Sequence, residues 1–280
     1  MEAQLEKKDL GFIGVCLLIT VASLAIGIPY FYQAFPEASI DFRVTREEAQ
    51  EQATAFLATR NIDLSEYRHS AIFRHHDPTK TFLERELGLQ KATETIGQPV
   101  QLWRWSNRWS KELTKEEYQV DITTTGKLVG FKREIAEEAA GASLDESAAR
   151  DLAESFLTTA LNRDLTKLDF VEAESREHPN RIDHTFSWAL RKFAVGEATY
   201  RFYVTIQGDQ IGGFDEKLKV PEAWEREFAE LRSRNEVTGQ VAAIFMLLRY
   251  WPCWRYFSGG SAPEISAGVQ RQSLAQSPPH

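Results

Sequence analysis

The stretches TREEAQEQATAFLATRNIDLSEY (residues 45–67) and LDESAARDLAESFLTTALNRDLTKL (residues 144–168) resemble one another. Four apolar positions recur in them with the same order and spacing. These positions are Ala49, Ala53, Phe56 and Leu57 in the first stretch and Ala149, Ala153, Phe156 and Leu157 in the second. Steps of four, three and one residues place each set on a single helical face. Each stretch therefore predicts a helix that packs its Phe and Leu against a sheet.

Both predicted helices are preceded by a residue that can cap a helix. Thr45 and Asp145 stand at these positions, and side chains of their types accept hydrogen bonds from the free N–H groups of the first turn. Glu48 lies three residues after Thr45, which completes the pattern of a capping box. We expect both helices to begin directly after these residues.

Strand-like sequence follows each predicted helix. Two segments each hold a Gly turn between two β-rich runs, and a further aromatic run precedes each of them. The four segments are YQVDITTTGKLVGFKREI (118–135), YRFYVTIQGDQIGGFDEKL (200–218), QLWRWSNRW (101–109) and HTFSWALRKF (184–193). The sequence predicts an α+β fold with two copies of one unit, a helix followed by about three antiparallel strands. An insertion with a short helix, PTKTFLERELGLQKA, lies between Asn61 and Pro99.

A long apolar segment precedes this body. LGFIGVCLLITVASLAIGIPYFYQAFP (10–36) holds 27 residues without a charge, more than the ~20 that cross the hydrocarbon core as a helix. Aromatic side chains, which favour the membrane interface, stand at its far end: Tyr30, Phe31, Tyr32 and Phe35. The segment predicts an uncleaved signal-anchor. A cleaved signal peptide is the alternative, since SLA at residues 23–25 fits a small-residue cleavage pattern.

The charges beside this segment do not by themselves set its orientation. Lys7 and Lys8 precede it, whereas Arg43 and Arg46 follow it closely. Long polar segments are translocated largely regardless of charge, and the body is such a segment. We expect a cytoplasmic N-terminus, an extracytoplasmic body and a location in the cell inner membrane.

The composition excludes two classes of protein. The net charge of −8 argues against nucleic acid as a partner, because phosphate binding requires a basic surface. The two cysteines are Cys16 and Cys253, so residues 17–252 hold no internal disulfide. A small disulfide-stapled scaffold is therefore excluded.

Sequence motifs for metal, nucleotide or nucleophilic chemistry are absent: the chain has no HExxH, CxxC, GxSxG, GxGxxG or Walker loop. The best local cluster is His75-His76-Asp77, with His69 upstream. Adjacent histidines point in different directions on a strand and on a helix, which makes the pair a poor chelate. We interpret them as solvated loop histidines.

A second polar cluster lies in HPNRIDHTFSW (178–188). Arg181 and Asp183 are two residues apart, so on a strand they share a face and can form a salt bridge. We expect Arg181, Asp183 and His184 to form a structural corner, because the sequence places no nucleophile beside them. The large aromatic residues are expected in core and cross-strand packing: Trp103, Trp105, Trp109 and Trp188.

Several segments together resemble one group of bacterial proteins. They are GFKREIAEEAAGASLDESAARDLAESFL (130–157), RIDHTFSW (181–188), VTIQGDQIGGF (204–214) and KVPEAWERE (219–227), between an N-terminal span and a later apolar segment. The group is the CPBP-type (CAAX-protease-like) intramembrane metalloproteases that carry a large extracytoplasmic N-terminal domain, and the resemblance covers residues 10–248. It implies that the chain holds the domain in front of a membrane-embedded peptidase.

The peptidase itself has no counterpart in this sequence. The family's membrane bundle carries Glu-Glu-x-x-x-Arg and downstream histidines. The acidic pairs Glu47-Glu48, Glu116-Glu117 and Glu137-Glu138 lack an Arg at that offset and lie outside any span. Enzymatic activity is therefore uncertain, and we expect no catalytic residue, no cofactor and no metal site in this chain. The alternative is a member of the peptidase family whose catalytic bundle is missing here.

The C-terminal region predicts an incomplete or interfacial apolar segment at residues 237–257. Its uncharged run, residues 237–248, has 12 residues, about 18 Å of helix and too short for ~30 Å of hydrocarbon. Residues 258–280 are rich in Ser, Gly, Pro and Gln and predict a disordered tail. A truncated or frame-shifted product explains both features. The alternative is a single-span protein whose RYWPCWRYF segment lies at the membrane interface.

The predicted organisation has five parts. They are a cytoplasmic tip with a transmembrane anchor (1–36), a first αβββ copy with the insertion (37–140), a second αβββ copy (141–236), the apolar segment (237–257) and the tail (258–280). Both copies resemble PepSY or cystatin units. We expect a binding or regulatory domain associated with an intramembrane protease, with the membrane and an extracytoplasmic protein or peptide as partners.

Overall fold

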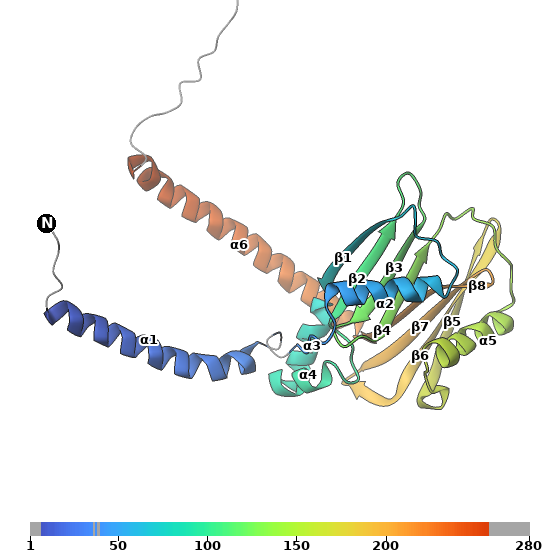
Figure 1. Ribbon diagram of the computed structural model, residues 1–280, viewed down its shortest axis with the longest axis horizontal. Helices are drawn as coiled ribbons and strands as arrows, with labels where there is room; N and C mark the ends of the chain where they lie inside the picture. The colour runs from blue at the N-terminus through green and yellow to red at the C-terminus, as the bar shows by residue number, and fades with distance from the viewer. Residues whose placement is uncertain (1–6, 36, 38–39, 258–280) are drawn as a thin grey trace, which may run out of the picture. The chain divides into compact units, whose positions relative to one another are not determined.

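One antiparallel sheet of eight strands organises the body in the computed structural model (Figure 1). The structure describes residues 7–35, 37 and 40–257. The strands are β1 (Arg68–Arg74), β2 (Arg104–Ser110), β3 (Glu117–Thr123), β4 (Leu128–Glu134), β5 (Leu168–His178), β6 (Arg181–Val195), β7 (Ala198–Gln207) and β8 (Gln210–Lys219). Their order across the sheet is β1-β2-β3-β4-β8-β7-β6-β5. The first four strands in the chain therefore build one half of the sheet, and the last four build the other.

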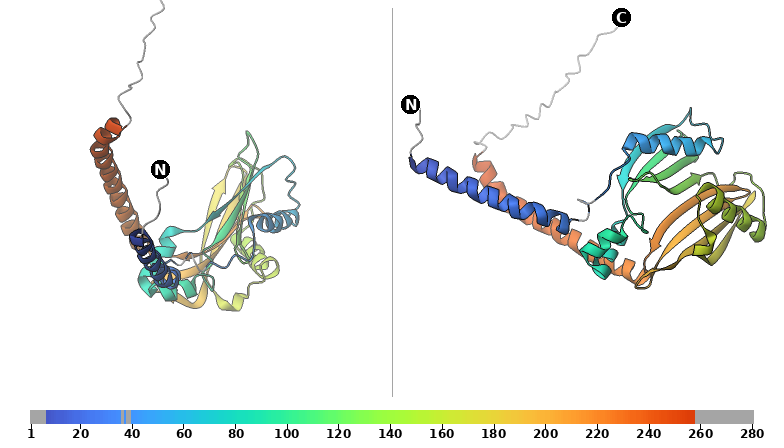
Figure 2. Two further views of the ribbon diagram at one scale, coloured as in Figure 1. Left: turned by 60° about the vertical axis from the view of Figure 1, so that its left-hand side comes forward. Right: turned by 60° about the horizontal axis from the view of Figure 1, so that its bottom comes forward.

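Six α-helices accompany the strands in the part of the chain that the structure describes, and α2 and α5 lie along the sheet (Figures 1 and 2). They are α1 (Lys7–Ala34), α2 (Arg46–Ala58), α3 (Asp77–Leu87), α4 (Leu89–Thr95), α5 (Glu146–Ser155) and α6 (Glu222–Phe257). A π-helical turn, Phe156–Ala160, continues α5, and a 3-10 turn, Leu165–Lys167, precedes β5. The two N-caps form as predicted: Thr45 and Glu48 make a capping box, and Asp145 accepts from the third residue after it. Two helices, α3 and α4, lie where the sequence predicted one short helix.

The helices α2 and α5 cover the same face of the sheet. Phe131 on β4 and Phe214 on β8 lie opposite one another in the strand register, so their side chains share that face. The ring of Phe56 meets Phe131 at 5.3 Å between centroids, and the ring of Phe156 meets Phe214 at 6.0 Å. The alanines and leucines of both predicted stripes are fully buried: Ala49, Ala53, Leu57, Ala149, Ala153 and Leu157. The two helical faces are thus confirmed.

Phe56 differs from the prediction that both phenylalanines are buried. Phe156 is 4% exposed, whereas Phe56 is only partly buried at the edge of the core. The guanidinium group of Arg60 lies 5.5 Å from the centre of the Phe56 ring and 4.7 Å from that of Phe156. A cation that reaches solvent therefore covers Phe56 in place of an apolar neighbour.

Each half of the sheet has four strands rather than the predicted three, and the additional strands are β1 and β5. Both lie at the edges of the sheet. Alternate residues of β1 are exposed, and most of β5 is exposed and charged. Edge strands carry such residues because charge discourages further strand pairing. The apolar alternation that marked the other strands is therefore weak in these two.

The two halves form one sheet, where the sequence predicted separate ones. Strands β4 and β8 pair through Gly130↔Asp215, Phe131↔Phe214 and Lys132↔Gly213, and we call this junction the seam. A free half would leave the backbone groups of β4 or β8 without partners along one edge. Pairing the two edges satisfies both, and no local sequence pattern encodes it.

The chain divides into two compact units, Met1–Glu225 and Arg226–His280. Within α1, the 24 residues Lys8–Phe31 have a mean hydropathy of 2.4 and are long and apolar enough to cross a membrane. Helix α6 continues through Arg249 to Phe257, so the apolar segment 237–257 is the last part of one long helix. The predicted tail and the first six residues of the cytoplasmic tip lie outside the described residues. The domain boundaries at residues 140 and 236 stay predictions.

Candidate functional site

The histidines of the predicted cluster each contact a different polar partner within the fold. His75 and His76 lie in the connection between β1 and α3, as expected, but both are engaged. Nε2 of His75 lies 2.6 Å from Oδ1 of Asp77, and Nδ1 of His76 accepts from the N–H of Thr79 (3.3 Å) as the N-cap of α3. His69 hydrogen-bonds instead to an Asn side chain on β2. In the part of the chain that the structure describes, no group of three or more His, Cys, Asp or Glu side chains could hold a metal ion.

The predicted corner around Arg181 is present and structural. Nε of Arg181 donates to Oδ1 of Asp183 (2.9 Å), and its side chain is 3% exposed. Its Nη1 donates to three carbonyl oxygens of the connection between β4 and α5, at 3.0, 3.1 and 2.8 Å. These belong to Ala136, Glu137 and Ala139. Because a buried guanidinium group needs all its donors paired, this corner fixes the connection between the two halves.

The remaining predicted residues also have packing roles. Nε2 of His184 lies 2.9 Å from the carbonyl oxygen of Leu144, and its Nδ1 lies 2.8 Å from Oγ of Ser175. The indole N–H of the partly buried Trp105 donates to the carbonyl of Val44 (3.0 Å). The other three tryptophans are buried: Trp103, Trp109 and Trp188. The interpretation of these residues as core and cross-strand packing is confirmed.

A cavity of about 690 Å³ lies on the sheet face that α2 and α5 leave uncovered. We call it the seam groove. Its floor consists of Gly130, Gly213, Thr185 and Thr205, and charged side chains from β1 to β4, from β8 and from the start of α6 surround it. Its volume falls within the range of about 300–1,000 Å³ that is typical of small-ligand pockets. The groove follows β4 and β8, and both halves of the sheet contribute to it.

The two floor glycines differ in what keeps them free of side chains. A Cβ on Gly130 would lie 3.0 Å from Cβ of Asp121, so packing requires that glycine. A Cβ on Gly213 would meet its nearest atoms at 3.4 to 3.7 Å, an ordinary contact, and its φ lies outside the left-handed region. A glycine inside a strand weakens it by roughly 0.5–1 kcal/mol relative to Ala and often marks a close approach by a ligand. Gly213 therefore keeps the floor open although packing does not require it.

Arg104 crosses the seam above Gly130 and is fully engaged there. Its Nη1 lies 3.3 Å from Oδ2 of Asp121 and 3.2 Å from Oδ1 of Asp215. Its Nη2 donates to the carbonyl oxygens of Gln101 (3.3 Å) and Glu216 (3.1 Å). Burial opposes its charge, yet the pKa of Arg104 is raised because Asp215 and Asp121 flank it. This residue ties β2 to β8 and has little capacity left for a ligand.

Other cations around the groove are more accessible. Nζ of Lys217 lies 3.0 Å from Oδ2 of Asp215 and 4.7 Å from the centre of the Tyr203 ring. Arg74 and Lys219 have no ion-pair partner among the described residues. In all, five Lys and Arg and three Asp and Glu line the groove. The groove is thus cationic in a chain whose net charge is −8.

His76 also lines the groove, as a neutral group. Burial lowers the pKa of its imidazole, and the charges of Lys217 and Arg104 lower it further, against the opposing effect of Glu225 and Asp77. Accepting the Thr79 N–H requires an unprotonated Nδ1. Near neutral pH, His76 therefore adds a polar ring to the groove but no positive charge.

A buried carboxylate connects the halves on the opposite face of the sheet. Glu216 of β8 is 0% exposed. Its Oε2 lies 2.5 Å from Nη2 of Arg163, and its Oε1 lies 2.9 Å from Nζ of Lys127. Burial lowers the pKa of Lys127, and the charge of Glu216 opposes that effect. Sequence reasoning missed this residue, because nothing in FDEKL distinguishes it from a surface Glu.

The groove itself carried a signal in the sequence that was not used. Gly130 stands alone inside a predicted strand, whereas Gly213 directly follows Gly212 inside another. An isolated glycine in a strand indicates a bulge or a close backbone approach. What the sequence does not contain is the pairing of β4 with β8, which brings the two glycines together.

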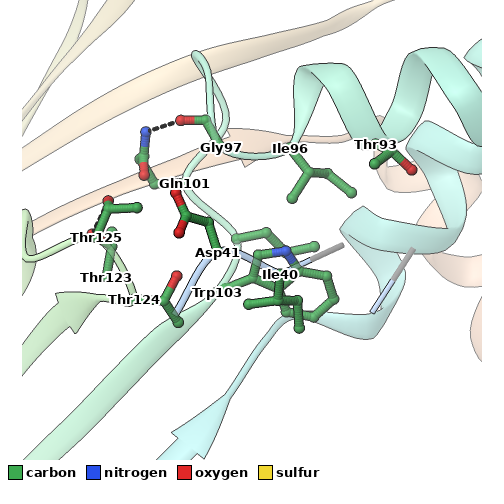
Figure 3. Close-up of a pocket in the computed structure, with 11 residues that line it drawn as sticks. Ile40, Asp41, Thr93, Ile96, Gly97, Gln101, Trp103, Thr123, Thr124 and Thr125 are labelled. Atoms are coloured by element: carbon green, nitrogen blue, oxygen red, sulfur yellow. Dashed lines mark hydrogen bonds between the residues drawn. The ribbon is translucent and has the colours of Figure 1, made fainter. Parts of the chain in front are cut away.

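A second, smaller cavity of about 90 Å³ lies between α4 and the turn that joins β3 to β4. Figure 3 shows its lining: the polar side chains of Asp41 and Gln101 on one side, and Ile40, Ile96 and Trp103 on the other. Nε2 of Gln101 donates to the carbonyl oxygen of a glycine in the same loop (2.6 Å). Its polar groups are satisfied within the fold, and we assign it no function.

Comparison with known proteins gives two matches. Residues 89–192 match the family model described as YcdB, YcdC repeated domain (DUF4901). This segment begins in α4 and ends in β6, so it includes strands from both halves of the sheet but not β8. The Bacillus megaterium YpeB C-terminal domain is similar in structure, with 14% sequence identity and a TM-score of 0.36. That match covers 62% of this chain and 63% of the YpeB chain.

No curated protein matches the chain. Neither match gives a link to the CPBP-type intramembrane proteases. The coarser features of the prediction hold: an apolar N-terminal helix and an α+β body with an antiparallel sheet.

Proposed function

We propose that the chain is a membrane-anchored, extracytoplasmic binding module that acts without catalysis, with the seam groove as its ligand surface. The observation that carries the proposal is the open, cationic groove that both halves of the sheet build. A glycine that packing does not require keeps its floor free. Such an opening is useful to a protein that binds a ligand and has no value for packing alone.

The anchor in this proposal is α1. No part of its apolar stretch Lys8–Phe31, which is 24 residues long, is buried in the protein. An apolar surface of that length is stable in a bilayer. We propose an uncleaved span with the body on the extracytoplasmic side of the inner membrane. Membrane fractions should retain the full-length chain under carbonate wash, and deletion of residues 1–36 should release a soluble body. A processed chain that begins near Ile26 would contradict the anchor.

The body in this proposal arose by duplication of one PepSY- or cystatin-like unit, a capped helix and four strands. Three features support it: the repeated stripe of α2 and α5, the mirrored strand order, and the contact of each helical Phe with a Phe of a seam strand. The description of the matched family as a repeated domain is consistent with it. The duplication places the groove on the junction between equivalent halves.

The association with an intramembrane protease rests on the sequence resemblance alone. The proposal of a binding module does not depend on it. Sequencing the gene beyond the codon of Leu248 in each reading frame tests the association directly. Further apolar spans with Glu-Glu-x-x-x-Arg would support a protease partner, and a stop codon would remove it.

The binding role is tested by thermal unfolding of the full-length chain in detergent against a panel of short peptides and anionic sugars. A ligand that binds only the folded state raises the unfolding temperature. We expect at least one such ligand, whose effect Gly213→Leu abolishes because leucine fills the floor. Ser70→Leu is the matched control, since Ser70 is exposed on β1, outside the groove. A ligand effect that survives Gly213→Leu, or no effect across the panel, would overturn the proposal.

A further inference from the structure

The floor of the seam groove is a strip of strand backbone that can accommodate an extended chain. Two rows of residues cross it in register: Asp121, Gly130, Asp215 and Tyr203 form one, and Lys132, Gly213, Thr205 and Thr185 form the other. Gly213 lies between Lys132 and Thr205, and it leaves the backbone of β8 accessible at that point. A flat strip of strand backbone that follows β4 and β8 suits a ligand that is itself extended.

The polar groups of the groove match a polypeptide backbone. The hydroxyls of Thr185 and Thr205 lie 3.1 Å apart, and each can both donate and accept a hydrogen bond. The amide groups of Gln101 and Gln119 also line the groove. Each already donates one N–H within the fold, to the carbonyl oxygen of Gly97 and to Asp121, and each keeps its amide oxygen as an acceptor. A peptide presents N–H and C=O groups in alternation, so mixed donors and acceptors satisfy it. The aromatic side chain in the groove, Tyr203, has its ring covered by Lys217, which removes the free ring face that a sugar would stack on.

The charged side chains of the groove determine whether it binds an acidic or a basic ligand. Arg104 and Lys217 together balance the charges of Asp121 and Asp215, with which they pair. Lys219 on β8 and Arg74 on β1 are then left with positive charge beside the open floor. A carboxylate that binds these groups forms charge-assisted hydrogen bonds, which are stronger than neutral ones. Lys and Arg on the ligand would meet like charges and be excluded.

We infer that the seam groove binds an extended peptide segment rich in Asp and Glu. This inference rests on the proposed function and names its ligand class. The peptide lies along β4 and β8 over Gly213, its backbone bonds to the hydroxyl and amide side chains, and its carboxylates bind Lys219 and Arg74. Because its charged groups are exposed to solvent, binding weakens as the salt concentration rises.

The test uses the full-length chain in nanodiscs and four fluorescent probes of equal length. They are an Asp/Glu-rich peptide, its Asn/Gln counterpart, a Lys-rich peptide, and an oligomer of glucuronic acid. We expect saturable binding of the acidic peptide alone, measured by fluorescence anisotropy. Arg74→Gln together with Lys219→Gln should weaken it by about tenfold or more, because the charge-assisted hydrogen bonds to the peptide carboxylates are lost.

Substitutions at Gly213 test whether the floor must stay open, and they leave the charge of the groove unchanged. Gly213→Leu should abolish binding, Gly213→Ala should weaken it less, and Ser70→Leu should leave it unchanged. If Gly213→Leu fails to fold, the alanine and double-glutamine variants carry the test. The inference is overturned if the Asn/Gln or Lys-rich peptide binds as tightly, if only the glucuronate oligomer binds, or if none does. If one of the other probes binds and Gly213→Leu abolishes that binding, the proposed function stands although the inference fails. If the binding is unchanged by Gly213→Leu, both the inference and the proposed function are overturned.

Discussion

The first half of the sheet (β1–β4 with α2) and the second half (β5–β8 with α5) follow the same plan with different degrees of burial. The strands of the first half have seven residues each, whereas those of the second have 10 to 15. Phe156, in the π-helical turn that continues α5, is buried, whereas its counterpart Phe56 of α2 is only partly buried. The seam joins the two halves, and the groove lies along it.

The largest effect is expected at the polar contacts of the seam. Glu216→Ala would leave Lys127 and Arg163 partly buried without their shared carboxylate. Breaking a buried ion pair on one side typically costs about 3–5 kcal/mol, measured as the free energy of unfolding in urea. Glu134→Ala on the neighbouring strand is the matched control. Its exposed pair with Lys132 should contribute less than about 1 kcal/mol. Equal effects of the two substitutions would show that the seam is not a special junction.

The two helical phenylalanines should differ in their contribution to stability. Phe156→Ala removes a buried ring and should cost about 3–5 kcal/mol. Phe56→Ala removes a partly exposed ring and should cost about 1–3 kcal/mol, because less apolar surface leaves the core. Urea unfolding of both variants measures the difference. A larger loss for Phe56→Ala would reverse the order of burial that the structure gives.

Much of this comparison was predictable from the sequence, since local chemistry determines it. The stripes of α2 and α5, their capping residues, the Gly turns and the structural corner at Arg181 all follow from spacing and residue type. The edge strands β1 and β5 were missed because charge suits an edge and hides the apolar alternation. The seam, and with it the groove and Glu216, depends on the pairing of strands about 80 residues apart in the chain. No local pattern contains that pairing.

The N-caps of α2 and α5 should contribute less to stability than the phenylalanines do, and by similar amounts. Thr45→Ala and Asp145→Ala each remove the side-chain acceptor of a first-turn N–H and should cost about 1 kcal/mol. Thr45 also takes part in a reciprocal bond, from its own N–H to Glu48 (2.8 Å). Thr45→Ala and Glu48→Ala should therefore be non-additive in a double-mutant cycle, whereas Asp145→Ala and Glu146→Ala should add. Additivity in both cycles would contradict the capping box.

The smallest expected effect is a pH dependence from His76 in the first half. Burial lowers the pKa of His76 in the folded state, so the unfolded chain binds the proton more tightly. Stability therefore falls as the pH drops through the ordinary His range toward the folded pKa. His76→Asn keeps a side chain that can cap α3 and removes the titration. Between pH 7 and 5 its stability should fall less than that of the wild type. Equal slopes for the two proteins would contradict a lowered pKa of His76 in the folded chain.

The most direct test of the account asks where an acidic peptide makes contact. A small diazirine side chain would replace Thr205, on the groove floor, or Thr54, exposed on α2 over the opposite face. After irradiation of the full-length chain in nanodiscs with the Asp/Glu-rich peptide, mass spectrometry would read the cross-links. We expect cross-links from position 205, none from position 54, and their loss on Gly213→Leu. Cross-links from position 54 alone, or equally from both positions, would contradict a ligand site in the seam groove.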